Sequence, residues 1–361
     1  MNERPGVSFV IPLHNGAASI ADTLRSVAAQ ADGRPVEIIV VDDRSSDTSR
    51  DIVRQFTVTP PIRLFDSDGR GAAAALNIGI RAAKYQVVCQ VDQDVVLSDG
   101  WMTRLAAQLD DPSVGAAQGY YATDGRAPLS ARVMGLDLEM RYASISGADT
   151  DHVCTGNSAY RREPLLRVGL FDEAFGYGCD NDMSYRLREA GYRLTLCREA
   201  RSTHRWREGL WGYLVQQYGF GYGRLDVVAK HPKRFGGDAV SPPGMMWHPL
   251  VLAIGVVLLG AAALGSALGL SWSRFALAGG ALIASLAIER TVAAARAFSR
   301  FGDPAAFAFP FFHLLRDGAW VTAIATWGIR RLRAVPPSPA QSMRRTLEPV
   351  EPVEPVEPTH R

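Results

Sequence analysis

The sequence predicts an α/β fold in which a doubly wound, mostly parallel, Rossmann-like sheet is followed by apolar C-terminal helices. Two observations predict it. Short apolar strands alternate with helical segments over residues 7–121, which is the pattern of a parallel sheet with helices on both faces. A stretch of 22 residues without charge follows at 249–270, long enough to span the roughly 30 Å of hydrocarbon in a bilayer.

The first third of the chain supplies the elements of the sheet in order. We expect strands at 7–12, 36–42, 62–65, 85–92 and 115–121. We expect helices near 17–29, 48–56, 72–84 and 101–109, several of them preceded by capping or breaking residues. Right-handed crossovers would then bring the carboxyl ends of the strands to one edge of the sheet. The stretch 125–205 is less regular and more charged.

Acidic residues end two of the expected strands. Asp42 and Asp43 follow one apolar run, and Asp92 and Asp94 follow another. Ligands bind beyond the carboxyl ends of the strands in an open parallel sheet, so these carboxylates are expected to share one site. The Asp-x-Asp spacing occurs four times in the chain and is weak evidence alone. Only the Asp92 pair directly follows a long apolar strand.

The charge balance excludes an electrostatic commitment to nucleic acid. Lys and Arg total 39 against 37 acidic residues, a formal net charge of +2. Basic residues concentrate at 186–234 and 330–333, on either side of the apolar C-terminal third, which is typical of a membrane surface. The four cysteines form no CxxC pattern, which suits a reducing compartment. Residues 1–5 lead into a strand without the apolar part of a secretory signal, so a cytoplasmic domain is expected.

A membrane region with two or three spans is predicted over residues 246–333. The segment 249–270 is the clearest span; 275–288 is apolar but short, and 305–329 is interrupted by charges. The basic cluster 330–333 conflicts with the positive-inside rule if all three segments cross. Two spans plus a re-entrant segment would keep that cluster inside, whereas the apolar lengths slightly favour three.

Two further segments flank this region. Residues 206–245 place aromatic and apolar side chains at helical spacing among basic ones. That pattern fits an amphipathic helix at a membrane interface and fits a helix packed on a protein core equally well. Residues 334–361 repeat Glu-Pro-Val and cannot form a core, so we expect a disordered Pro/Glu-rich tail.

A set of motifs within residues 1–205 resembles those of family 2 glycosyltransferases, which have a GT-A fold. The motifs are 7–15 (VSFVIPLHN), 41–48 (VDDRSSDT), 69–79 (GRGAAAALNIG), 91–94 (VDQD), 155–157 (TGN), 169–173 (GLFDE) and 178–187 (GCDNDMSYRL). Taken together and in this order, they are far more specific than any one of them. The resemblance implies a domain, residues 1–205, that binds a UDP- or GDP-sugar.

The resemblance also implies roles on the donor side. The residues expected to bind the nucleotide-sugar are Pro12, Leu13, His14, Asp42, Asp43, Asn77 and Asp92. Asp94 is expected to ligate Mg²⁺ or Mn²⁺, because such cations prefer oxygen ligands and take only one or two protein carboxylates beside phosphates. His204 aligns with a histidine that often follows this domain, and it is a second candidate metal ligand.

On the acceptor side, the resemblance makes Asp180 the catalytic base. It would remove the proton of the acceptor hydroxyl while the oxygen attacks the anomeric carbon opposite the leaving diphosphate, which inverts the configuration. Gly156, Asn157 and Asp182 are the expected acceptor-side residues. The alternative for Asp180 is that it only caps the helix that follows it.

The sequence therefore predicts an inverting, metal-dependent glycosyltransferase in the plasma membrane, multi-pass, with its catalytic domain cytoplasmic. It would transfer sugar to a lipid-linked acceptor or to a polysaccharide of the cell envelope. One alternative is a processive polysaccharide synthase, although the chain has no QxxRW motif. Another is a non-catalytic membrane scaffold, because Leu76 and Cys179 stand where the family usually has Arg and Glu. A dinucleotide oxidoreductase is excluded, since no G-x-G-x-x-G follows the first strand.

Overall fold

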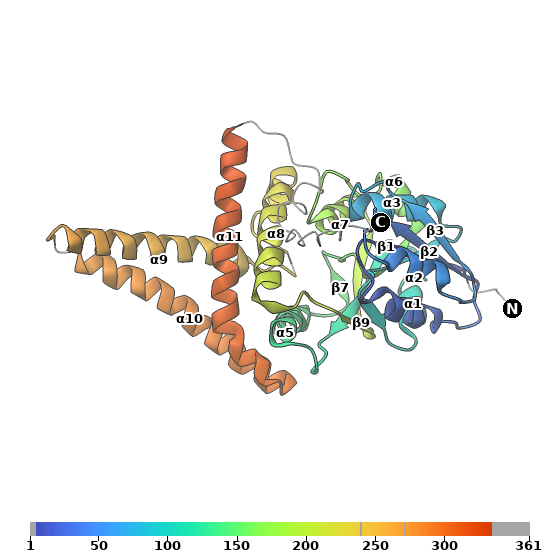
Figure 1. Cartoon of the computed structure of the whole chain (residues 1–361), viewed down its shortest axis with the longest axis horizontal. Helices are drawn as coiled ribbons and strands as arrows, with labels where there is room; N and C mark the ends of the chain where they lie inside the picture. Colours follow the sequence, from blue (N-terminus) through green and yellow to red (C-terminus); the bar gives the residue numbers. More distant parts are fainter. Residues whose placement is uncertain (1–4, 239, 271, 334–361) are drawn as a thin grey trace, which may run out of the picture.

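The computed structural model describes residues 5–333 except 239 and 271. The expected tail, 334–361, lies outside the described residues. Within the described part, a nine-stranded sheet forms the centre of the N-terminal domain, and long helices extend from one side of it (Figure 1).

The strands are ordered β3-β2-β1-β4-β8-β6-β9-β5 across the sheet, and β7 pairs with β9 at the side. Their bounds are β1 (Val7–Leu13), β2 (Val36–Asp42), β3 (Ile62–Asp66), β4 (Val87–Val91), β5 (Val95–Leu97), β6 (Val114–Ala122), β7 (Asp149–Thr150), β8 (Asn157–Arg161) and β9 (Arg193–His204). Strands β1 and β2 pair in parallel from end to end, with Leu13 opposite Asp42. The carboxyl ends of these two strands therefore coincide.

The five expected strands are confirmed, and they are β1, β2, β3, β4 and β6. The prediction of a mostly parallel sheet is wrong in detail. Among the strand pairs of the described residues, β1/β2, β1/β4, β2/β3 and β6/β9 are parallel, and the pairs β4/β8, β6/β8, β5/β9 and β7/β9 are antiparallel. The sheet is mixed because β8 inserts between β4 and β6, which keeps those two strands parallel in direction.

Helices cover both faces of the sheet, as a doubly wound fold requires. The expected helices are confirmed as α1 (Ile20–Ala28), α2 (Ser49–Gln55), α3 (Ala72–Ala82) and α4 (Trp101–Gln108); α5 (Leu129–Ser144), α6 (Arg162–Arg167) and α7 (Cys179–Glu189) follow. Successive residues of a strand point to opposite faces. Accordingly, Phe9 packs in one core with α1 and α4, and Val10 packs in the other with α3 and α7.

The C-terminal helices are α8 (Gly209–Lys230), α9 (Pro243–Ala267), α10 (Ser273–Phe301) and α11 (Phe309–Leu332), with 3₁₀ turns at Pro232–Arg234 and Pro304–Ala308. Helices α9 and α10 form a hairpin that projects away from the sheet, whereas α11 lies beside α8 (Figure 1). Among the described helices, α9 and α10 are long and apolar enough to cross a membrane. Helix α11 does not meet that test, and the number of spans stays a prediction.

Helix α8, predicted as either interfacial or core-packed, is packed on α11 along one face. The Tyr213 hydroxyl donates to the carbonyl oxygen of Phe312 at 2.9 Å. Asp226 accepts from Trp327 Nε1 at 2.8 Å and pairs with Arg330 at 2.7 Å. The core-packed alternative therefore describes this face of α8.

Buried charges join the sheet domain to the apolar hairpin. Arg290 of α10 pairs with Asp317 of α11 at 3.0 Å, and Arg316 of α11 reaches Asp137 of α5 at 3.3 Å. Arg290, Arg316 and Asp317 are all buried. A buried charge is tolerated when it is paired, so these contacts fix α5, α10 and α11 relative to one another.

Candidate functional site

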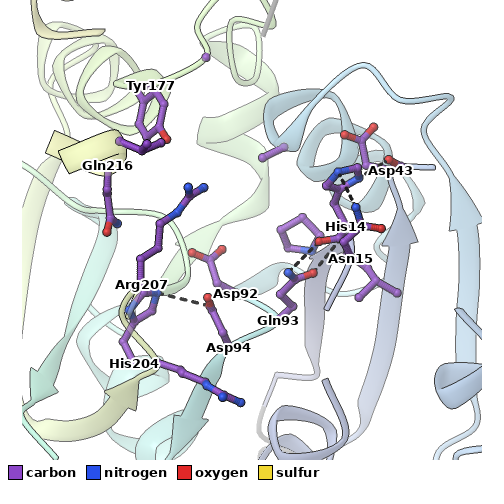
Figure 2. Close-up of a pocket in the computed structure, with 16 residues that line it drawn as sticks. His14, Asn15, Asp43, Asp92, Gln93, Asp94, Tyr177, His204, Arg207 and Gln216 are labelled. Carbon is purple, nitrogen blue, oxygen red and sulfur yellow. Dashed lines mark hydrogen bonds and ion pairs between the residues drawn. The ribbon is translucent and has the colours of Figure 1, made fainter. Parts of the chain in front are cut away.

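A cavity of about 490 Å³ opens at the carboxyl ends of β1 and β4 (Figure 2). Its lining residues are Pro12, Leu13, His14, Asn15, Asp43, Ala72, Asp92, Gln93, Asp94, Gly176, Tyr177, His204, Arg205, Arg207, Val215 and Gln216. Seven of the expected site residues are thus brought together: Pro12, Leu13, His14, Asp43, Asp92, Asp94 and His204. The cavity lies where an open α/β sheet binds its ligands.

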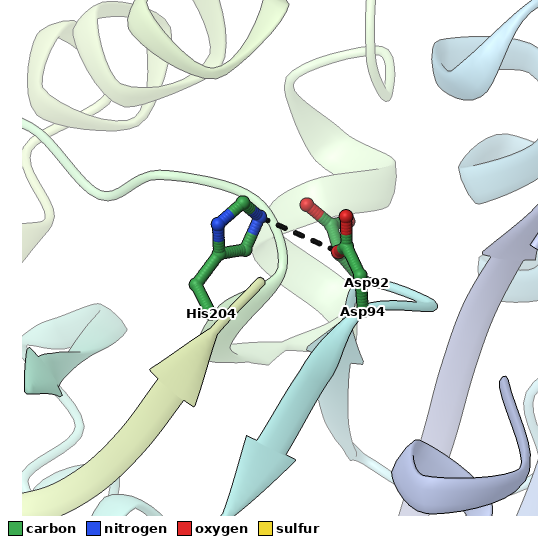
Figure 3. Close-up of side chains that lie close together, drawn as sticks. All are labelled: Asp92, Asp94 and His204. Carbon is green, nitrogen blue, oxygen red and sulfur yellow. Dashed lines mark ion pairs between the residues drawn. The ribbon is translucent and has the colours of Figure 1, made fainter. Parts of the chain in front are cut away.

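Asp92, Asp94 and His204 converge in the cavity (Figure 3). One ligand atom from each lies within 4.8 Å of the others. His204 Nε2 is 3.3 Å from Asp94 Oδ1. Strand pairing explains the approach, because β5 and β9 place Val95 opposite His204. Two carboxylates and one imidazole are a donor set that suits Mn²⁺ or Mg²⁺, so the residues fit the expected divalent ion.

Asp94 and His204 stabilise each other's charge. Burial raises the pKa of Asp94, but the charge and hydrogen bond of His204 outweigh it and lower that pKa overall. Burial lowers the pKa of His204, and Asp94 reverses this and raises it overall. The two shifts agree, because each group favours the charged form of the other.

Gly156 lets the chain pass directly against Asp92. Its φ is +85°, and a Cβ built there would lie 2.2 Å from Asp92 Oδ2. The Asp92 backbone N–H donates to the Gly156 carbonyl oxygen at 3.2 Å. Any larger residue would displace the carboxylate, so the glycine is a packing requirement of the cavity floor.

Asn157, also expected on the acceptor side, is fully buried. Its Oδ1 accepts from Trp101 Nε1 at 2.6 Å, and its backbone pairs with Val91. The side chain therefore supports the end of β4 from inside the core and does not line the cavity.

Hydrogen bonds fix the opposite wall of the cavity. The Asp43 carboxylate accepts from the Gly71 N–H at 2.9 Å and from the Ser67 hydroxyl. Gln93 accepts from the His14 N–H at 2.7 Å and donates to the His14 carbonyl oxygen at 2.9 Å. This bridge ties the end of β4 to the end of β1. Sequence reasoning missed Gln93, although it is the central residue of the Asp-x-Asp motif.

Asp42 and Asn77 are not among the residues that line the cavity. Asp42 is buried and pairs with Arg50 at 2.9 Å. Asn77 is buried and exchanges hydrogen bonds with the backbone of Phe171, donating at 2.8 Å and accepting at 2.9 Å. Both side chains hold neighbouring loops, and a contact of either one with a donor stays a prediction.

Asp180 lies in the first turn of α7, whose cap position is occupied by Gly178 without a side-chain hydrogen bond. The Oδ1 atom of Asp180 accepts from the backbone N–H of Asn181 in the same turn at 2.9 Å, so both the capping alternative and the base role stay predictions. Its Oδ2 is 3.5 Å from Nε2 of His152, a residue that the sequence did not single out.

Burial raises the pKa of Cys154 to about 12, and the charges of Asp180 and Asp92 act in the same direction. The charges of both carboxylates thus act on the same thiol.

The Asp182 carboxylate is bound by basic side chains on the face of α7 opposite Asp180. It is fully buried and accepts from Arg186 Nε at 2.8 Å. It also contacts Lys230 Nζ at 2.7 Å and His231 Nε2 at 2.8 Å. In this structure it anchors the end of α8 to α7, and an acceptor contact stays a prediction.

Arg207 and Tyr177 are cavity residues that sequence reasoning missed. Figure 2 shows the Arg207 side chain directed into the space between Asp92 and Tyr177. Arg207 also contributes to lowering the pKa of Asp94, after the larger effects of burial and His204. Its only sequence signal was its position in 204–207 (HRWR), directly after the expected metal histidine.

Comparison with known proteins defines the class of this domain. Residues 8–169 match the family model described as glycosyl transferase family 2. Residues 8–169 therefore make up a family 2 glycosyltransferase domain, which confirms the resemblance for the motifs within that range; the 178–187 motif lies beyond it.

Two curated relatives and one solved structure specify the similarity. The chain is 29% identical over 261 residues to the pre-mycofactocin glycosyltransferase of Mycobacterium tuberculosis, covering 70% of this chain and 53% of the relative. It is 28% identical over 223 residues to chondroitin synthase of Escherichia coli, covering 52% and 32%. It thus spans about half the length of the first relative and a third of the second.

The solved structure is the mannosyltransferase PcManGT from Pyrobaculum calidifontis in complex with GDP-Man and Mn²⁺. Its TM-score is 0.58 at 22% identity, with coverage of 90% of this chain and 88% of that one. At this identity the likeness establishes the fold, a GT-A-like mixed sheet, and extends over the C-terminal helices as well.

Proposed function

We propose that this protein is an inverting, metal-dependent glycosyltransferase that moves a sugar from a nucleotide-sugar to an acceptor hydroxyl. The observation that carries the proposal is the cluster of Asp92, Asp94 and His204 in the cavity of a family 2 glycosyltransferase domain. The complex of PcManGT with GDP-Man and Mn²⁺ supports the same pairing of ligands on this fold.

The cavity residues are proposed to have different roles in sugar transfer. Asp94 and His204, with Asp92, would hold Mg²⁺ or Mn²⁺, which supplies positive charge to the donor diphosphate. His14 and Asp43 lie on the wall proposed to bind the nucleotide. Asn77 would support that wall through its bonds to the 171–173 turn.

The bond changes follow from these positions. The acceptor oxygen forms a bond to the anomeric carbon while the bond from that carbon to the diphosphate oxygen breaks. Asp180 takes the hydroxyl proton, and the electron pair leaves with the nucleoside diphosphate. Arg207 lies in the cavity near Asp94, and its guanidinium is placed to stabilise the departing negative charge.

The C-terminal region would place this reaction at a membrane. Helices α9 and α10 have the length and apolar composition of spans and expose large apolar side chains such as Val257 and Leu277. We propose that this hairpin enters the plasma membrane and that the sheet domain lies on the cytoplasmic side. A lipid-linked or glycan acceptor would then reach the cavity from the side of α8.

A second candidate is a processive polysaccharide synthase. The observation in its favour is that several relatives are named as synthases, including chondroitin synthase and the poly-beta-1,6-N-acetyl-D-glucosamine synthase of Staphylococcus epidermidis. The missing QxxRW motif argues for single addition instead. The number of sugars added to the acceptor distinguishes a processive synthase from a glycosyltransferase that adds one sugar.

The test uses the full chain in mild detergent with a panel of UDP- and GDP-sugars and membrane lipid extract. We expect release of nucleoside diphosphate from one donor with Mn²⁺ or Mg²⁺ and none with EDTA. The anomeric configuration of the product, read by NMR, tests inversion. A chain of many sugars would favour the synthase. Donor binding without turnover, with every donor and with lipid present, would favour the non-catalytic scaffold and contradict the proposal.

A further inference from the structure

His152 is a buried histidine that lies against the candidate base and that no motif contains. Its side chain is 7% exposed, and its Nε2 is 3.5 Å from Asp180 Oδ2. Among the described residues, His152 is the cationic partner that the structure gives to Asp180. The pair lies next to the cavity, since Gly176 and Tyr177, which precede α7, form part of its lining.

The backbone around His152 is fixed to the helix that carries Asp180. The Ser184 hydroxyl accepts from the Val153 N–H at 2.9 Å and donates to the Val153 carbonyl oxygen at 3.2 Å. The Thr150 hydroxyl accepts from the His152 N–H at 3.3 Å and donates to its carbonyl oxygen at 3.1 Å. Ser184 stands one helical turn after Asp180, so both lie on one face of α7. These bonds keep the distance between the imidazole and the carboxylate nearly constant.

Three carboxylates face the His152 imidazole: Asp180, Asp238 and Asp151. Two of them already have a cation. Asp238 pairs with Arg224 at 2.8 Å, and Asp151 lies 3.5 Å from Arg234. Of the three carboxylates, Asp180 is therefore the one for which His152 is the cationic partner.

We propose that His152 is a positioning residue for Asp180, orienting its carboxylate for proton abstraction. This inference rests on the proposed function, in which Asp180 is the base. When the acceptor oxygen bonds to the anomeric carbon, its proton passes to the Asp180 carboxylate and stays there until product leaves. His152 takes no proton in that step. It acts only through the carboxylate beside it.

The protonation of His152 agrees with this role. Burial lowers the pKa of His152, but the hydrogen bond and charge of Asp180, with the charges of Asp238 and Asp151, outweigh it and raise the pKa overall. The raised pKa favours a charged imidazole, and the attraction between opposite charges holds the two side chains together. It also restricts the rotation of the Asp180 side chain, which reduces the cost of aligning the base with the hydroxyl.

The pH profile of the full chain tests the proposal. In His152→Gln the amide can still donate a hydrogen bond but carries no charge. We expect His152→Gln to lower kcat/KM about tenfold near pH 5.5, where the imidazole of the unaltered chain is charged, and only about threefold near pH 8.5, where deprotonation has already removed part of that charge. His152→Gln added to Asp180→Asn should cause no further loss. A loss in His152→Gln that is equal at both pH values, or full additivity of the two losses, would overturn the proposal.

His248→Gln is the matched control, because His248 also pairs with a carboxylate, Glu289 at 2.8 Å, but does so on α9 and α10. We expect its pH profile to follow that of the unaltered chain. A second measurement needs no turnover: histidine-ring NMR of the full chain, with the His152 signal identified by its loss in His152→Gln. Asp180→Asn should move the titration of that ring to lower pH, and an unchanged titration would contradict the pairing.

The two measurements separate failure of this inference from failure of the proposed function. If no donor is turned over by the unaltered chain, the proposed function is wrong whatever the NMR shows. If transfer occurs and the ring titration responds to Asp180→Asn, but the loss of activity in His152→Gln is equal at both pH values, the proposed function stands and the positioning role is wrong.

Discussion

Two histidine–aspartate pairs of similar geometry have different surroundings in this protein. His204 lies 3.3 Å from Asp94 and His152 lies 3.5 Å from Asp180. The first pair is open to the cavity and has Asp92 beside it, so a cation can bind among three ligand atoms. The second pair lies outside the cavity lining, where arginines already hold the neighbouring carboxylates. The comparison indicates that the neighbouring residues, and not the pair itself, distinguish the proposed metal centre from the proposed catalytic base.

The largest effect should come from the first pair. We expect Asp94→Asn to lower turnover about a thousandfold or more, because it removes a metal ligand and with it charge stabilisation of the diphosphate. Donor affinity should fall together with turnover. Initial rates and calorimetric donor binding with Mn²⁺ measure the two. Asp68→Asn is the control: Asp68 belongs to another Asp-x-Asp, is exposed, and has a φ of +57° that Asn tolerates.

The second pair should respond differently. We expect Asp180→Asn to reduce transfer about a hundredfold to a thousandfold, which is the usual contribution of a general base. Donor and Mn²⁺ binding should remain within about threefold of the unaltered chain, because Asp180 does not line the cavity. Loss of donor binding in Asp180→Asn would assign both pairs to the same function and remove the contrast between them.

A third test alters the support of the metal pair without touching its ligands. In Gly156→Ala the new Cβ would meet the Asp92 carboxylate at 2.2 Å, so we expect activity to fall about thirtyfold through displaced ligand geometry. Gly147→Ala is matched, since Gly147 has a similar φ of +76° and no atom within 4 Å of the added Cβ. Both variants carry backbone strain. Equal activity losses would show that strain, and not contact with Asp92, causes the effect.

The sequence predicted the parts of the fold that have a strong apolar signal. Strands β1, β2 and β4 are almost wholly buried and mostly apolar. Strands β8 and β9 were not predicted, because Asn157 and Ser158 in β8 are buried polar residues and β9 is rich in charge. Tertiary pairing, and not local propensity, makes these segments strands. The mixed character of the sheet followed from the insertion of β8.

The candidate site was predictable where motifs carried it. The resemblance made Asp94 and His204 candidate metal ligands and Asp92 a donor-binding residue, and strand pairing between β5 and β9 helps to bring the three together. His152 and Arg207 were missed, because a histidine or arginine outside a motif has no sequence signal until its partner in space is known. Conversely, Asn157 belongs to a motif, but its side chain is inside the core.

The smallest predicted effect concerns Asp182, which lies on the other face of α7 from Asp180. Burial raises the pKa of Asp182, but hydrogen bonds from Lys230, His231 and Arg186 outweigh it and hold the pKa below its usual value. A carboxyl whose pKa is lowered by folding stabilises the protein above its unfolded pKa of about 3.9 and loses that contribution as pH falls through the folded pKa.

We therefore expect Asp182→Asn to lower the free energy of unfolding by about 1.5 kcal/mol at pH 7, because one charged acceptor of three hydrogen bonds is lost. The difference should shrink toward zero below the folded pKa, where the unaltered chain is protonated at this position. Thermal melts of both chains across pH 3–8 measure it. A difference that is constant over this range would mean that shape, and not charge, holds α8 to α7, and the Asp180 helix would then be positioned independently of protonation on its buried face.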